Sequence, residues 1–142
     1  KACAATGKKI IFSTGMSTYE EIDQAVEWLV DCETVMLHCN STYPAPLKDL
    51  NLSCIQTLKE RYECEVGYSG HEFRLGTTVA AVYLGATYLD RTMWGSDHMS
   101  SIEPQGLIKL VKGVRELEEA HGDGIKRVTS GELGPRKKLR GY

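Results

Sequence analysis

Four short runs of apolar and β-branched residues occur along the chain, and each is followed by a segment with the apolar spacing of an amphipathic helix. The runs are residues 9–14, 34–39, 65–69 and 86–89. Repeated β-then-α units of this length predict an α/β fold with parallel strands and crossover helices. Four consecutive β/α units form either an open sheet or half of a (β/α)8 TIM barrel, and the pattern alone does not decide between them.

The first predicted helix has signals at its start and along one face. Ser17 or Thr18 suits the N-cap position, and two glutamates follow in the first turn, where the helix dipole favours negative charge. Apolar residues at the i, i+4, i+7 and i+8 spacing predict the buried face. These residues are Ile22, Val26, Leu29 and Val30.

Three further helices follow the later runs. Apolar periodicity predicts helices around residues 52–58 and 77–84, and Gly85 suits the C-cap of the second of them. Pro104 suits a first helical turn and opens a long helix that ends near His121.

Length and charge restrict the possible classes of protein. The 142-residue chain is long enough for one domain, with β/α units in about residues 1–124 and a solvated, basic tail in residues 125–142. Its net charge of −2 and the absence of a long basic run predict no nucleic-acid partner.

No apolar stretch approaches the roughly 18 residues that a transmembrane helix needs, and no signal-peptide pattern opens the sequence. These features predict a protein with no membrane partner. The five cysteines form no CxxC pair, which favours a reducing, cytoplasmic location in which each cysteine is a small buried apolar residue.

Polar and reactive residues gather just after the predicted end of each run. Parallel α/β folds bind ligands at the carboxyl ends of their strands, so these residues are predicted to converge on one site. They are Ser13, Thr14 and Gly15; His38, Asn40, Ser41 and Tyr43; Ser69 and His71; and Asp90, Arg91, Ser96, Asp97 and His98.

Some of these residues have both a functional and an ordinary interpretation. Residues 13–15, before a helix start, form either a cradle for an anion or a simple strand-to-helix turn. His71, in a loop after a strand, is a candidate metal ligand or acid–base group, although a metal needs at least one more protein ligand. We expect His38 to be a packed core residue, and His98 and His121 to lie on the surface, where His98 could contact a substrate.

Four sequence blocks resemble the N-acetylneuraminate (sialic acid) synthase family, in the family's order. They are KIIFSTGM at residues 9–16, LHCNSTYPAP at 37–46, VGYSGH at 66–71, and LDRTMWGSDH followed by SIEP at 89–98 and 101–104. The resemblance covers nearly the whole chain. It implies that the four β/α units are the second half of the family's (β/α)8 catalytic barrel.

The resemblance also implies an activity for the complete parent enzyme. The family's synthases condense phosphoenolpyruvate with N-acetylmannosamine, or a related amino sugar, to give N-acetylneuraminate and phosphate. They require a divalent metal, usually Mn²⁺ or Mg²⁺. The WGSDH sequence at residues 94–98 is slightly more similar to sialic acid synthases than to synthases of bacterial analogues such as legionaminic acid.

Individual site residues are implied by their positions in the matching blocks, whereas no catalytic acid or base is identified. Serine hydroxyls suit a phosphate, and a carboxylate suits sugar hydroxyls. The matches assign phosphoenolpyruvate binding to Ser13, Ser41 and Ser69, sugar binding to Tyr43 and Asp97, and metal binding to His71.

Three departures from the family pattern stand out. The opening half of the barrel, with a metal-site glutamate and a phosphate-binding lysine, is expected to be missing, as is the antifreeze-like domain that commonly follows the barrel. Gly70 replaces the usual aspartate before His71, so an orienting carboxylate is expected to be lost. Between Leu89 and Asp90, a segment of about five residues that carries a glutamate and a second metal histidine is absent.

These departures leave alternatives to a synthase fragment. One is a decayed, non-catalytic remnant that still binds a phosphorylated ligand, and another is an unrelated open-sheet protein that acts in protein contacts. A half-barrel leaves open sheet edges and an exposed apolar face. We therefore expect self-association or pairing with a separately encoded first half.

Overall fold

The computed structural model describes residues 2–91 and 101–141, and it contains one parallel sheet. The four strands lie in chain order, so each strand pairs with the one before it. This arrangement confirms the predicted α/β class, while the assignment to the second half of a barrel stays a prediction. The strands are β1 (Ile10–Ser13), β2 (Thr34–Cys39), β3 (Glu65–Ser69) and β4 (Tyr88–Asp90).

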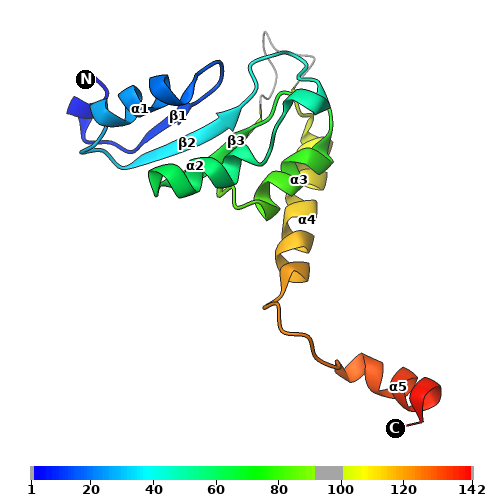
Figure 1. Ribbon diagram of the computed structural model, residues 1–142. Coiled ribbons are helices and arrows are strands. Elements are labelled where there is room, and N and C mark those ends of the chain that lie inside the picture. The colour runs from blue at the N-terminus through cyan, green and yellow to red at the C-terminus, as the bar shows by residue number, and fades with distance from the viewer. Residues whose placement is uncertain (1, 92–100, 142) are drawn as a thin grey trace.

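Helices follow each strand, as the periodicity predicts (Figure 1). The α-helices are α1 (Tyr19–Trp28), α2 (Cys54–Tyr62), α3 (Leu75–Tyr83), α4 (Pro104–His121) and α5 (Leu133–Arg140). Short 3-10 helices occupy Ala4–Thr6, Leu47–Asp49 and Ser130–Glu132.

The core lies between one face of the sheet and the first three helices. Ile22 of α1, Ile55 of α2 and Ala81 of α3 belong to one buried cluster with strand residues such as Met36 and Tyr68. Because side chains alternate along a strand, the intervening residues point to the second face of the sheet. α4 packs beside α3 rather than on the sheet itself.

Local signals predicted the starts of α1 and α4 correctly, and the end of α1 less well. Thr18 is the N-cap of α1, and it forms a capping box with Glu21. Pro104 occupies the first turn of α4, as expected. The predicted burial of Val30 is wrong, because α1 ends at Trp28 and Val30 is 77% exposed beyond it.

The fourth strand begins and ends later than its apolar run suggests. Asp90, predicted as the first residue of a loop, is instead the last residue of β4 and pairs with Ser69 of β3. Its backbone carbonyl also accepts a hydrogen bond from the Gly70 amide at 3.1 Å. The structure therefore places a carboxylate at the end of the fourth strand.

The amino ends of the strands are joined by one lysine. Lys9 Nζ lies 2.6 Å from Glu33 and 3.1 Å from Glu65. It also donates to the Tyr88 hydroxyl at 3.0 Å. These contacts raise the pKa of Lys9 above its usual value. The lysine thus links β1 to the starts of the other strands, at the end of the sheet opposite to the predicted site.

The last segment, residues 125–142, contains regular secondary structure, although none of its described residues is buried. Residues 125–142, predicted as a tail, contain a 3-10 turn and α5, and Figure 1 shows α5 far from the sheet. Within the described ranges, none of the helices combines the length and the apolar character needed to cross a membrane. All five cysteines are free thiols, of which Cys39 is buried and Cys3 is exposed, contrary to its predicted burial.

The open sheet predicts self-association of this chain. β1 and β4 are edge strands, and Ile11 on β1 is 53% exposed. We expect sedimentation velocity to show species heavier than the 15.8 kDa chain, with a fraction that rises with protein concentration. Replacing Ile11 by Lys should reduce that fraction, whereas the same change at Ile125, 67% exposed in the last segment, should not. A monomer at all concentrations would contradict the expectation.

Candidate functional site

The carboxyl ends of all four strands meet at one edge of the sheet. Their last residues are Ser13, Cys39, Ser69 and Asp90. In the parallel register Cys39 lies beside Ser69, and Ser69 lies beside Asp90. Side chains at paired positions share a face, so hydroxyl, thiol and carboxylate groups line the second face at this edge. This is the convergence that the sequence predicted.

Ser13 and Ser41 converge on Gly15. The Gly15 amide donates to Ser13 Oγ at 3.2 Å. A Cβ added at Gly15 would collide with Ser41 Oγ and would lie 3.4 Å from both Ser13 Oγ and Cys39 Sγ. A side chain at position 15 would therefore displace the Ser41 hydroxyl, and glycine leaves that hydroxyl in place. The result is a group of two hydroxyls around a small backbone turn, before the start of α1.

His71 lies at the centre of the site, in the loop after β3. The residue is 7% exposed, and its Nδ1 lies 2.8 Å from the backbone carbonyl of Asn40. A carbonyl only accepts, so Nδ1 carries the proton and Nε2 keeps its lone pair. Nε2 accepts a 2.7 Å hydrogen bond from the Tyr43 hydroxyl, whose ring stacks on the imidazole with centroids 3.9 Å apart. The basic nitrogen is thus directed toward the site.

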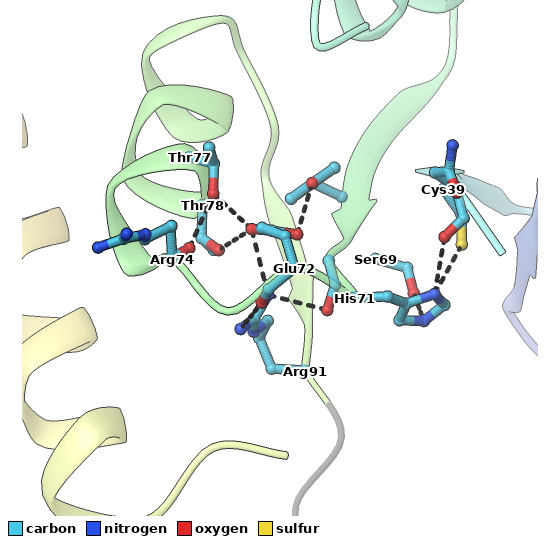
Figure 2. Close-up of polar contacts among 11 residues, drawn as sticks. Cys39, Ser69, His71, Glu72, Arg74, Thr77, Thr78 and Arg91 are labelled. Atoms are coloured by element: carbon cyan, nitrogen blue, oxygen red, sulfur yellow. Dashed lines mark hydrogen bonds and ion pairs between the residues drawn. The ribbon is translucent and has the colours of Figure 1, made fainter. Parts of the chain in front are cut away.

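A serine connects this imidazole to a carboxylate. Ser69 Oγ donates to Asp90 Oδ2 at 2.9 Å and lies 3.3 Å from His71 Nε2. Cys39 Sγ lies 3.7 Å from Nδ1 on the other side of the ring (Figure 2). The site therefore combines an oriented imidazole and a hydroxyl from the end of β3 with an exposed carboxylate from β4.

The loop after β2 is held so that its backbone faces His71. Asn40 Nδ2 donates to the carbonyl of Asp49 at 3.0 Å, and Asn40 Oδ1 accepts from the Thr42 amide at 3.0 Å. Farther along the same loop, the Ala45 amide donates to the His71 carbonyl at 3.1 Å. These contacts fix both the imidazole and the backbone of His71 against the loop after β2.

The donor set has only part of what a divalent metal needs. Within residues 2–91 and 101–141, no cluster of three or more His, Cys, Asp or Glu side chains suits a metal ion. His71 Nε2 and the Asp90 carboxylate are nonetheless linked through Ser69. One imidazole and one carboxylate suit Mn²⁺, and Mg²⁺ commonly binds through one or two carboxylates with water in the other positions.

The structure brings together five of the six predicted site residues, in two adjoining groups. Ser13 and Ser41 form the first group, whereas Tyr43, Ser69 and His71 form the second. Asp97 and His98 lie outside the described residues. His38 points to the core, where it is 9% exposed and its Nε2 donates to the Leu50 carbonyl at 2.7 Å, as predicted for a packed histidine.

Two contributions to the site were not singled out from the sequence. Cys39 and the backbone carbonyl of Asn40 both contact the His71 ring. The period-two alternation of strands could have placed Cys39, since it shares a face with Ser69. No sequence signal identifies the Asn40 carbonyl, because the direction of a backbone group in a loop is set by tertiary contacts.

Comparisons with known proteins agree on one family. A sequence model of the NeuB family matches residues 1–126. N,N'-diacetyllegionaminic acid synthase of Campylobacter jejuni is 40% identical over 145 residues, which cover 93% of this chain and 43% of that protein. Human N-acetylneuraminate-9-phosphate synthase is 34% identical over 145 residues, which cover 96% of this chain and 40% of that protein.

A solved structure of a sialic acid synthetase has the same fold over this chain. N-acetylneuraminic acid synthetase of Leptospira borgpetersenii, crystallised with citrate, superposes with a TM-score of 0.84 and 33% identity. The superposition covers 99% of this chain and 53% of that one. The chain thus spans less than half the length of these two curated relatives, and about half of this solved chain.

The buried position of His38 predicts a specific acid sensitivity. Burial lowers the pKa of His38 below its usual value, so the folded state keeps the imidazole neutral. As pH falls below about 6.5, the unfolded chain binds a proton at His38 that the folded chain does not, and the free energy of unfolding decreases. Thermal unfolding of His38→Gln between pH 7.5 and 5.5 should depend less on pH than that of the wild type. Equal pH dependence in both proteins would contradict this account.

Proposed function

Because the chain belongs to the NeuB family, we propose that it is part of a sugar-acid synthase that condenses phosphoenolpyruvate with N-acetylmannosamine or a related amino sugar. The complete barrel would carry out the reaction, and this chain would supply the phosphate-binding hydroxyls and one metal ligand. The convergence of Ser13 and Ser41 on Gly15, beside the oriented imidazole of His71, is the observation that supports this proposal most strongly.

The two serines would bind the phosphate of phosphoenolpyruvate. Hydroxyl groups and backbone amides neutralise no charge, but they donate charge-assisted hydrogen bonds to phosphate oxygens. Gly15 has no side chain to displace the Ser41 hydroxyl, so its backbone lies close to both serines. Residues 13–15 also precede α1, whose amino end favours negative charge. Ser69, at the end of β3, would add a third hydroxyl.

The reaction joins C3 of phosphoenolpyruvate to the carbonyl carbon of the sugar, and addition of water then releases phosphate. A divalent metal, Mn²⁺ or Mg²⁺, would polarise the sugar carbonyl. His71 would hold that ion through Nε2, the nitrogen whose lone pair the Asn40 carbonyl keeps free of a proton. Asp90 would stand close by as a second ligand, through a carboxylate oxygen, in place of the metal ligands expected from the absent segment.

The amino sugar would contact Tyr43, which is 45% exposed beside His71. Asp97, the second proposed sugar contact, lies outside the described residues. The higher identity to a legionaminic acid synthase than to the human enzyme does not favour N-acetylmannosamine over its bacterial analogues. The proposal therefore keeps the sugar at the level of N-acetylmannosamine or a related amino sugar.

The proposal predicts that this chain binds phosphoenolpyruvate through its serines. Replacing Ser13 or Ser41 by Ala removes a hydrogen bond to a charged group, worth about 1.5–3 kcal/mol, so affinity should fall by roughly tenfold or more. Isothermal titration calorimetry measures this. Ser53→Ala is the matched control, because Ser53 precedes α2 and its side chain makes no capping bond; its affinity should equal that of the wild type.

Two results would count against the proposal. Equal affinity in Ser13→Ala and the wild type would exclude the proposed phosphate cradle. Binding of phosphoenolpyruvate that is independent of Mn²⁺, with no phosphate released when the complete parent protein meets N-acetylmannosamine and related amino sugars, would instead support a non-catalytic remnant.

A further inference from the structure

His71 is held from both sides of its own backbone, and one arginine supplies two of the contacts. Arg91 directly follows β4. Its Nη1 donates to the Gly70 carbonyl at 2.9 Å, and its Nη2 donates to the Glu72 carbonyl at 2.7 Å. Figure 2 shows the guanidinium beneath this loop, on the side away from the imidazole. The arginine thus holds the Gly70–His71 peptide and the Glu72–Phe73 peptide, one on each side of the site histidine.

A buried carboxylate holds the guanidinium in turn. Glu72 Oε1 lies 3.2 Å from Arg91 Nη1, with side chains 0% and 6% exposed. The same oxygen accepts from the hydroxyls of Thr77 and Thr78, and Oε2 accepts from the Tyr68 hydroxyl at 2.9 Å. Burial, together with the nearby Glu72 carboxylate, raises the pKa of Tyr68, which keeps its hydroxyl a donor. The carboxylate is therefore satisfied on both oxygens.

Gly70 leaves the space that this pair occupies. A Cβ at position 70 would lie 2.7 Å from Arg91 Nη1 and 3.0 Å from Glu72 Oε2. A side chain at position 70 would therefore enter the space where Glu72 meets Arg91. The resemblance described above places an aspartate at this position in most of the family. Here the carboxylate comes instead from two residues farther along the chain.

We propose that Arg91 is a positioning residue for His71, and that Glu72 supplies the carboxylate that holds Arg91 in place of an aspartate at position 70. The clamp, defined as Gly70, Glu72 and Arg91, fixes the backbone of His71 so that Nδ1 faces the Asn40 carbonyl and Nε2 faces the site. The clamp itself is a feature of this fold, whereas its use in orienting a metal ligand rests on the proposed function.

A buried ion pair is weak evidence for stability, because desolvation offsets most of the attraction between the charges. The ion pair between Glu72 and Arg91 instead fixes the geometry of the loop that carries His71. The contacts come from Arg91 after β4, from the loop after β2 and, through Glu72, from α3, so three separate parts of the fold set the histidine. Removing the guanidinium should free the loop and let the imidazole exchange between tautomers.

The direct test reads the tautomer of His71 by long-range ¹H–¹⁵N NMR of the imidazoles in the full chain. The wild type should show a fixed Nδ1–H form. Arg91→Met should shift the His71 nitrogens toward averaged values, and Arg91→Lys should restore the fixed form in part, since lysine can still donate to one carbonyl. Arg61→Met is the control, because Arg61 pairs with Asp23 on the surface. A folded Arg91→Met protein with an unchanged His71 tautomer would overturn the proposal.

A double-mutant cycle tests whether positions 70 and 72 share one carboxylate site. Gly70→Asp adds a second buried carboxylate, and Glu72→Ala leaves Arg91 uncompensated, so each change should lower the unfolding midpoint by about 8 °C or more. The combined Gly70→Asp/Glu72→Ala variant should be more stable than either single variant. A combined loss equal to the sum of the single losses would contradict the shared site.

If Glu72→Ala does not fold, Glu72→Gln keeps the shape without the charge, and its His71 tautomer decides the outcome. Averaged nitrogen shifts would support the clamp, and unchanged shifts would oppose it. Neither readout needs a ligand. A clamp that passes both tests in a chain that binds neither phosphoenolpyruvate nor Mn²⁺ would leave the inference standing and reject the proposed function.

Discussion

Parallel pairing of four strands in chain order is the constraint on which the site depends. It brings the last residues of β1 to β4 to one edge of the sheet, with Cys39, Ser69 and Asp90 directly beside one another. Three helices bury the other face, so the polar side chains at these strand ends have one face to occupy. The chemistry of the site thus follows from strand register rather than from any single motif.

The loops after the strands orient the His71 imidazole, which strand register alone does not do. His71 lies two residues beyond β3, and its orientation comes from the Asn40 carbonyl in front and the Arg91 guanidinium behind. Such a fixed imidazole presents one defined lone pair, which is the property that a metal ligand or a base requires. The departure at Gly70 concerns the same buried space as Glu72, because a side chain at position 70 would meet both the Glu72 carboxylate and Arg91. The expected loss of an orienting carboxylate stays a prediction, and the proposed clamp would offset that loss through Glu72.

Much of the fold could be predicted from the sequence, because periodicity and helix-start signals are local. The bounds of β2, β3 and α4 agree with the predicted runs, and Thr18 caps α1. The end of α1 and the extent of β4 were predicted less well, since Val30 lies beyond the helix and Asp90 pairs within the sheet. A polar residue at the end of a short edge strand has no apolar signal, and contacts with Ser69 and Gly70 on the neighbouring segment hold Asp90 in place. The ion pair between Glu72 and Arg91 could likewise not be predicted from their spacing in the sequence, because only the tertiary fold brings the two residues together.

In the proposed function, this edge of the sheet binds a phosphate and a divalent ion side by side. Diffraction from crystals of the chain grown with phosphoenolpyruvate and Mn²⁺ tests it most directly, because manganese is located by its anomalous signal. The account predicts phosphate density between Ser13 and Ser41 and a manganese peak at His71 Nε2, with the Tyr43 hydroxyl displaced from that nitrogen. Manganese and phosphate bound elsewhere, with the hydrogen bond between Tyr43 and His71 intact, would contradict it.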